Sequence, residues 1–169
     1  MAEFTVIGSA SVGMDNMGWE RIIGLGGTAS AGPAIKFSDT KGKVTILGVQ
    51  SYASGGFTFV MPAASGEAGV KPTLGVDNVL RSKNSAAGLD STYGIRMFPL
   101  WGYRASDRGP REVVGMGVEM TETYKCEGSG CDDLHSGGDG QMTLNIQMTV
   151  ERGDWDRVLF LMGAGIFWN

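Results

Sequence analysis

Two stretches of strict alternation decide the fold class: "EVVGMGVEMTETY", residues 112–124, and "QMTLNIQMTVE", residues 141–151. Their apolar positions are Val114, Met116, Val118 and Met120 in the first, and Met142, Leu144, Ile146, Met148 and Val150 in the second. The intervening residues are mostly Gly, Glu, Thr, Gln and Asn. This period of two predicts β-strands with one buried face and one wet face. The chain has 10 methionines, and at these positions we expect them to fill a core.

The rest of the chain continues the β pattern. "FTVIGSASVGM", residues 4–14, alternates in the same way, and further strands are predicted at 19–25, 44–49, 57–61, 93–103 and 158–168. Residues 63–94 are rich in Ala, Gly, Ser and Asn, and "VDNVLRSKN", residues 76–84, is the only plausible short helix. The 28 glycines, about 17% against a usual ~7%, indicate many turns. Some eight β segments predict a sandwich or a barrel.

Length and charge bound the function. With 169 residues, one domain with a real core is expected. The net charge of -4 leaves no basic field for a phosphate backbone, so we expect no nucleic-acid partner. No apolar run is long enough for a transmembrane helix, and the start lacks the pattern of a signal peptide. A cytosolic protein and a mature exported chain both fit these observations.

Residues with catalytic or metal-binding chemistry are sparse. "CEGSGCDDLH", residues 126–135, holds Cys126, Cys131 and the single His135, which are too few good ligands for a zinc site. If the chain is exported, a Cys126–Cys131 disulfide is favoured and stabilises by roughly 2 kcal/mol; in the cytosol, reduced thiols are the alternative. No G-x-S-x-G motif accompanies a Ser-His-Asp set, and "GLGGTASAG", residues 24–32, lacks the Lys-Ser/Thr of a phosphate loop. We therefore expect no enzyme, no metal and no cofactor.

The acidic residues outside the strands give no catalytic pair. Glu67, Asp77, Asp90 and Asp107 fall in separate predicted loops. Because acid–base catalysis by carboxylates needs two of them at a defined spacing, we expect these to be solvated turn residues.

Three stretches, taken in order, resemble subunits of chaperone-usher fimbriae, nearest to the K88-like group. They are the N-terminal strand with "GWERIIGLGG" and "KGKVTILGV", the middle segment "YGIRMFPLWGYRASDRGPREVVGMGVEM", and the closing "DWDRVLFLMGAGIFWN". The resemblance implies an immunoglobulin-like β-sandwich that lacks its last strand. A periplasmic chaperone completes such a sandwich first, and then the N-terminal extension of the next subunit. The chain is shorter than the large major subunit, so a minor subunit or short pilin is the expected member.

On this resemblance, residues 1–17 are an extension that donates a strand, and residues 18–169 are one pilin-like domain. Phe4, Val6 and Val12 would enter the groove of a neighbouring subunit, while Gly8 and Ala10 would pass over its shallow part. An ordinary first strand of the protein's own sheet is the equal alternative. The implied function is a structural or adhesive fimbrial subunit, exported through the periplasm to an extracellular fimbrium. Its partners would be other subunits, the chaperone and usher, and a host receptor or glycan, with no membrane insertion.

Three other classes remain as alternatives. A phage or virion structural protein, such as a decoration or tail subunit, would share the β-rich and site-poor composition. A small enzyme or sugar-binding domain is indicated only by Trp101, Tyr103 and Trp155. An outer-membrane barrel ranks last, because "VLFLMGAGIFW", residues 158–168, is apolar on both faces instead of lipid-facing on one and polar on the other.

Overall fold

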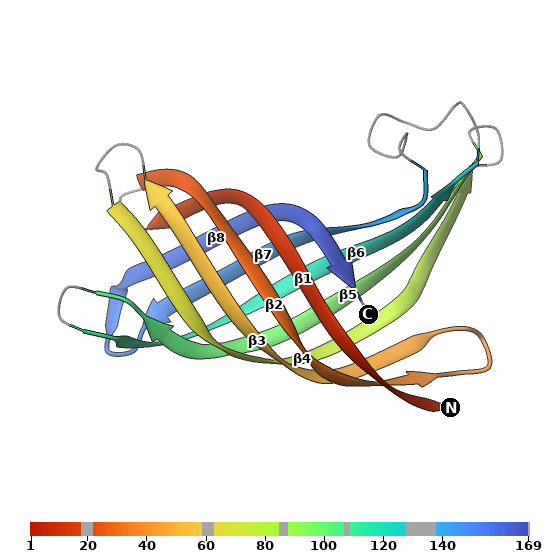
Figure 1. Cartoon of the computed structure of the whole chain (residues 1–169), viewed down its shortest axis with the longest axis horizontal. Coiled ribbons are helices and arrows are strands. Elements are labelled where there is room, and N and C mark those ends of the chain that lie inside the picture. The colour runs from red at the N-terminus through yellow and green to blue at the C-terminus, as the bar shows by residue number, and fades with distance from the viewer. Residues whose placement is uncertain (18–21, 59–62, 85–87, 107–108, 128–137, 169) are drawn as a thin grey trace.

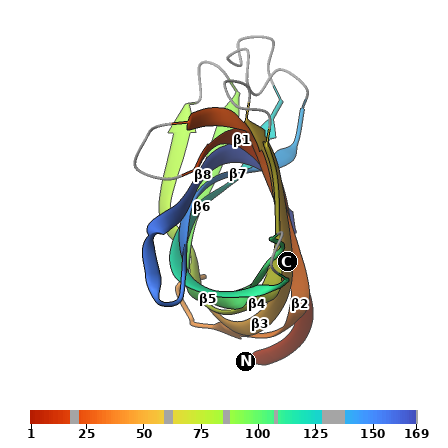
Figure 2. The same cartoon turned by 90° about the vertical axis from the view of Figure 1, so that its left-hand side faces the viewer.

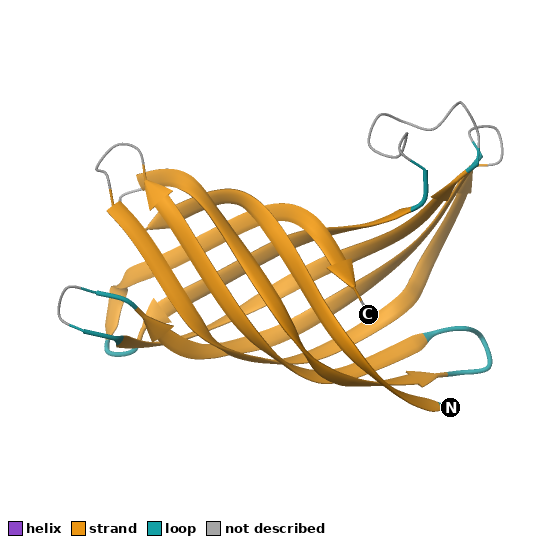
Figure 3. Ribbon diagram, viewed as in Figure 1, coloured by secondary structure: helices purple, strands orange, loops and turns teal. Residues whose placement is uncertain are grey.

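The computed structural model contains eight long β-strands (Figures 1 and 3). They are β1 (Ala2–Met17), β2 (Ile22–Ser38), β3 (Val44–Thr58), β4 (Ala63–Asn84), β5 (Leu89–Arg104), β6 (Arg111–Cys126), β7 (Gly140–Glu151) and β8 (Asp154–Trp168). The structure describes residues 1–17, 22–58, 63–84, 88–106, 109–127 and 138–168. Within these ranges, no helix has the length and apolar character needed to cross a membrane. The all-β prediction is confirmed.

The eight strands form a closed antiparallel barrel. Each strand pairs with the next along the chain, and β8 pairs back onto β1. Seen along the barrel in Figure 2, the ribbons make a complete ring. This corrects the expected immunoglobulin-like sandwich: the strands belong to one continuous sheet that closes on itself, and the β1–β8 seam is hydrogen-bonded from Gly8 to Met17.

The register of the strands sets the tilt of the barrel. Following paired residues from Ala2 once round the barrel returns to β1 at Val12, ten residues farther along. The path runs through Phe37, Thr45, Val76, Ile95, Met120, Leu144 and Ala164. Such a stagger means that the strands are inclined to the axis, by about 35–45° in closed barrels. Figure 1 shows this inclination.

The two ends of the barrel differ. We call the end where β1 begins and β8 ends the terminal end, and the opposite end, which carries the β5–β6 and β7–β8 turns, the distal end (Figure 1). Gly153 takes φ 86° in the β7–β8 turn, a left-handed conformation that favours glycine. At the terminal end, the carboxylate of Asp39 accepts hydrogen bonds from the backbone amides of Lys41 (2.8 Å) and Lys43 (2.9 Å), which fixes the β2–β3 turn.

Strand β4 replaces the predicted helix at residues 76–84. Its register with β5 shifts between Val76 and Leu80, and Asn78 within the shift has φ 58°. The Asn78 amide donates a hydrogen bond of 2.6 Å to the Gly42 carbonyl, which holds the bulge against the β2–β3 turn. Bulges bend a strand and increase its twist. Beyond the bulge between Val76 and Leu80, β4 and its neighbours project past the terminal end (Figure 1).

Candidate functional site

The two faces of the barrel wall are reversed relative to the sequence prediction. On β6, Met116 is 65% exposed, whereas Glu119 is fully buried. On β7, Leu144 is 52% exposed, whereas Asn145 is 2% exposed. The alternation of both strands is as predicted, but the methionine face lies on the outside and does not fill a core. The polar face, expected in water, lines the inside of the barrel.

The same reversal holds around the barrel. Among the described residues, 19 polar or charged side chains are buried against 11 hydrophobic ones, and 27 large hydrophobic residues are exposed. A barrel folded in water buries its apolar side chains and leaves polar ones outside. In this barrel, by contrast, the outer surface is mostly apolar and the buried inner surface is mostly polar.

Strand β5 shows the outer surface most clearly. Its sequence "YGIRMFPLWGYR", residues 93–104, places six apolar or aromatic side chains outward: Tyr93, Ile95, Met97, Pro99, Trp101 and Tyr103. The alternate residues face inward, among them Arg96 and, directly after Tyr103, Arg104. Tyr93 and Tyr103 are ten residues apart. With a rise of about 3.3 Å and a tilt of about 40°, the two rings bound an apolar belt roughly 25 Å high.

Other exposed aromatic residues lie near the two edges of this belt. Phe4 and Phe37 stand on β1 and β2 near the terminal end, and Phe57 stands on β3 near the distal end. At the distal edge, the Trp101 indole N–H donates a hydrogen bond of 2.9 Å to Glu112, which lies beyond the belt. An aromatic ring with a polar group at its outer edge suits a boundary between an apolar phase and water.

The middle of the lumen holds a buried charge cluster, which we call the lumen cluster: Lys71, Arg96 and Glu119. Glu119 accepts hydrogen bonds from the hydroxyls of Ser9 (3.1 Å) and Thr143 (2.8 Å). The Arg96 guanidinium donates to two carbonyls on either side of the β1–β8 seam, those of Gly8 and Trp168, both at 3.3 Å. Arg96 therefore ties the closing seam to the inside of the barrel.

Aromatic rings support both cations of the lumen cluster. The Lys71 ammonium nitrogen lies 4.2 Å from the centre of the Phe98 ring, and the Arg96 guanidinium lies 5.0 Å from that of Phe167. The contact with Arg96 accounts for one apolar residue on the inner face of β8, Phe167, beside the buried Leu159 and Leu161.

A second charged group closes the lumen toward the distal end. Arg104 donates to the Thr149 hydroxyl at 3.0 Å and lies 3.6 Å from Glu151 and 3.9 Å from Glu67. Thr149 in turn donates to Glu67 at 2.9 Å. Glu67, expected as a solvated turn residue, is thus a buried lumen residue of β4, which corrects that prediction. Asp77 and Asp90 lie in β4 and β5, and Asp107 falls outside the described residues.

Side chains fill the lumen at mid-height. Arg96, Gln50 and Glu119 are fully buried, and Lys71 is 1% exposed. Gln50 accepts from Ser30 (2.9 Å) and donates to Thr73 (2.8 Å), so a polar network spans three strands. The interior of eight strands is just wide enough for such filling. The described residues therefore form a plugged barrel, with no wide aqueous channel through them.

The predicted donor-strand residues all lie in the chain's own barrel. Phe4, Val6, Gly8, Ala10 and Val12 are on β1, which pairs with β2 on one edge and with β8 on the other. In the structure, the first strand therefore belongs to the chain's own sheet, as in the alternative interpretation. Residues 2–17 are part of the same barrel as the remaining strands. The three large side chains, Phe4, Val6 and Val12, are exposed on the outer wall.

Gly8 has a specific role at the seam. It pairs directly with Trp168, and a side chain at this position would collide with the Trp168 ring and the Ser30 carbonyl. We expect Gly8→Leu to displace Trp168 and destabilise the folded barrel by about 1–3 kcal/mol, the usual cost of overpacking. Denaturant titration of the refolded protein measures this change. Ala10→Leu, on the same face of β1, is the matched control, and an equal loss in both variants would contradict a special role for Gly8.

The structure describes only one of the two cysteines in the predicted disulfide. Cys126 ends β6, whereas Cys131 and His135 lie outside the described residues. The disulfide stays a prediction. The sequence analysis did not identify the charged residues of the lumen, such as Arg96 and Glu119. The sequence pattern that could have identified them is a charged residue on the polar face of several strands, positive on some strands and negative on others.

Comparisons with protein-family models, with curated proteins and with solved structures give no match for this chain. The site is therefore defined by geometry alone. It consists of a closed barrel with an apolar outer belt, aromatic residues near both edges of the belt, and a polar lumen filled by side chains.

Proposed function

We propose that this chain is an integral membrane protein that spans a bilayer as an outer-membrane-type β-barrel. The observation that carries the proposal is the inverted wall: Met97 and Met116 face outward while Arg96 and Glu119 are buried. An apolar medium outside the barrel gives this arrangement its stability, since the outer side chains then avoid water and the inner ones stay hydrogen-bonded.

Closure of the sheet supports the same proposal. In hydrocarbon, every backbone amide and carbonyl needs a partner within the protein, and a closed barrel provides one for each strand. The apolar belt of roughly 25 Å, bounded by aromatic residues, matches the outer band of membrane barrels. We therefore propose membrane insertion, in place of the expectation from the sequence that the chain does not insert.

The plugged lumen narrows the function further. Because Arg96, Lys71 and Gln50 fill the interior, solute passage through a wide pore is not the proposed activity. The barrel would instead serve as a membrane-embedded scaffold, and its activity would reside in the surfaces that extend beyond the belt. These surfaces are the distal turns and the projecting ends of β4, β5 and β6 (Figure 1).

The fimbrial and virion hypotheses remain untested by any comparison. Completion of an immunoglobulin-like sandwich by a donor strand needs an open sheet edge. The β1–β8 pairing occupies that edge in this structure, and neither hypothesis gives a reason for an apolar belt around the whole barrel. The geometry therefore favours the membrane proposal over both.

Refolding tests the proposal directly. The full chain, unfolded in urea, is diluted either into plain buffer or into phosphatidylcholine vesicles. We expect β-sheet circular dichroism, flotation with the vesicles, and a gel mobility that changes on heating, all only in the presence of lipid. A monodisperse, folded monomer in plain buffer would overturn the proposal.

A further inference from the structure

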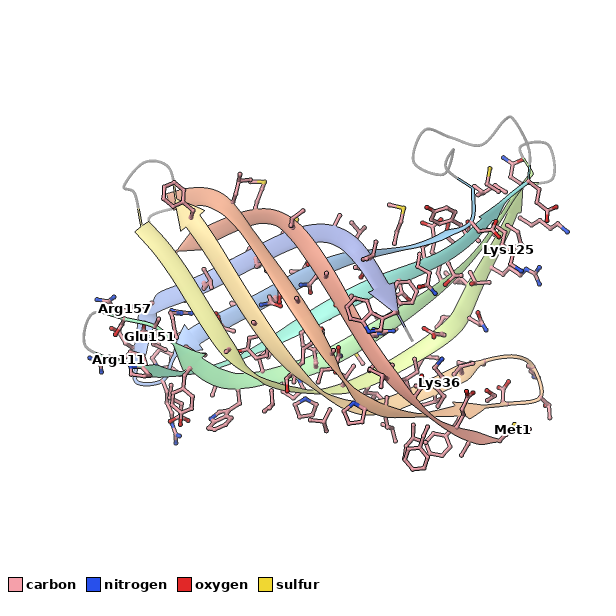
Figure 4. All side chains as sticks on the ribbon, viewed as in Figure 1. Met1, Lys36, Arg111, Lys125, Glu151 and Arg157 are labelled. Carbon is pink, nitrogen blue, oxygen red and sulfur yellow. The ribbon has the colours of Figure 1, made fainter. Side chains whose placement is uncertain are left out.

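Three arginines gather at the distal end of the barrel, and we call them the arginine rim: Arg111, Arg152 and Arg157. They line one concavity of about 620 Å³ together with Glu112, Glu151 and Asp154. Figure 4 shows Arg111 and Arg157 at the same end as Glu151, whereas Lys36 and Lys125 lie at the other end. The rim therefore combines guanidinium groups from β6, the β7–β8 turn and β8.

The acids of this concavity already have partners. Glu112 receives the Trp101 indole N–H and the Arg152 guanidinium, both at 2.9 Å. These two hydrogen bonds, the one from Trp101 first, hold the pKa of Glu112 below its ordinary value. Glu151 lies 3.6 Å from Arg104 inside the lumen. Glu112 and Glu151 are therefore already paired with Arg152 of the rim and Arg104 of the lumen.

The rim arginines keep donors to spare. Arg152 contacts Glu112 through one terminal nitrogen, and Arg157 contacts Asp154 through Nε at 3.3 Å. Arg111 has no ion pair within the described part of the chain. A guanidinium carries five N–H donors, so most of the rim's donors remain open to a ligand. The Arg152 and Arg157 side chains are about two-thirds exposed or more, at 71% and 66%.

The position of the rim fits one kind of ligand. Tyr103 pairs with Glu112, and Trp101 pairs with Val114, so the rim begins where the apolar belt ends. In a bilayer this is the level of the lipid headgroups. Guanidinium groups bind phosphate through paired, charge-assisted hydrogen bonds, which lysine does not reproduce.

We propose that the arginine rim binds the phosphate groups of lipid headgroups at the distal surface of the bilayer. This inference rests on the proposed membrane function. The proposed occupant is a lipid and not a free anion, because Glu112 accepts hydrogen bonds from Trp101 of the apolar belt and from Arg152 of the rim, so belt and rim meet at this residue.

The test uses the full chain refolded in phosphatidylcholine vesicles. A matched fraction of either phosphatidic acid or oleate is added, which supply a phosphate or a carboxylate. After extraction into mild detergent, native mass spectrometry counts the lipids that each barrel retains. We expect phosphatidic acid to be retained in preference to oleate. The R111Q/R152Q/R157Q variant should retain it at least roughly tenfold more weakly, because charge-assisted hydrogen bonds are lost.

Control variants and outcomes separate this inference from the membrane proposal. K83Q/K125Q, at the opposite end, should retain phosphatidic acid like the wild type. If the triple variant fails to fold, R111Q alone carries the test, since Arg111 has no ion pair in the described residues. Equal retention by the rim variant and the wild type overturns the inference, as does equal retention of oleate or displacement by inorganic phosphate. A wild-type chain that does not enter vesicles overturns both proposals.

Discussion

Met97→Arg is expected to destabilise the barrel in vesicles by about 2–4 kcal/mol, the cost of a cation on the lipid face near the bilayer midplane. Met97 lies near the middle of the stretch from Tyr93 to Tyr103 on the outer face of β5 and is 48% exposed. In water, the same substitution at an exposed position would change stability little and would improve solubility. The sign and size of the effect therefore report the medium around the barrel.

Leu80→Arg is the matched control for Met97→Arg. Leu80 is 67% exposed, more than Met97, but it pairs with Tyr93 at the terminal edge of the apolar belt. We expect its substitution to cost about 0–1 kcal/mol, as for a cation near the interface of a membrane barrel. Urea titration of both variants in vesicles, followed by tryptophan fluorescence, gives the comparison. Equal stabilities for the two variants would show that Met97 does not face lipid.

The sequence predicted most of the strands, but not β4, and it assigned the two faces of β6 and β7 to the wrong sides. Residues 141–150 and 158–168 were placed almost as β7 and β8 lie, because period-two alternation identifies a strand. Alternation alone does not say which face meets the core, since both arrangements have the same period. The informative detail was the makeup of the polar face. Thr143, Asn145 and Gln147 are uncharged and compact, which suits a narrow lumen better than a surface in water.

The lengths of the strands were underestimated for a different reason. The segment at 63–94 was expected to be mostly irregular, yet it forms β4 and the start of β5. Its outward positions include Ala68, which pairs with Ala53, and small residues give little hydrophobic contrast between faces. The bulge at Asn78 also interrupts the alternation, so residues 76–84 lost their strand signal. A barrel was one of the two folds that the sequence allowed, but the pattern of each strand alone does not show that β1 pairs with β8.

The second large effect is expected inside the barrel, at Glu119. This residue is fully buried, and it is the acidic group that acts electrostatically on both Lys71 and Arg96. Glu119→Gln keeps the shape of the side chain but removes the acid that acts on Lys71 and leaves Arg96 with only the charge of Asp77. Removing one partner from a buried charged group costs about 3–5 kcal/mol, so we expect a loss of that size in the free energy of unfolding.

Two further variants make the Glu119 prediction specific. Glu122→Gln, three residues along β6, removes an acid that is not fully buried, and its expected cost is below about 1 kcal/mol. Lys71→Met combined with Glu119→Gln removes one cation along with the acid and restores the net charge of the lumen cluster, so it should recover part of the loss. Urea titration in vesicles measures all three. A Glu119→Gln barrel as stable as Glu122→Gln would show that the lumen charges are not coupled, and the closed seam that Arg96 holds at Gly8 and Trp168 would then need another source of stability.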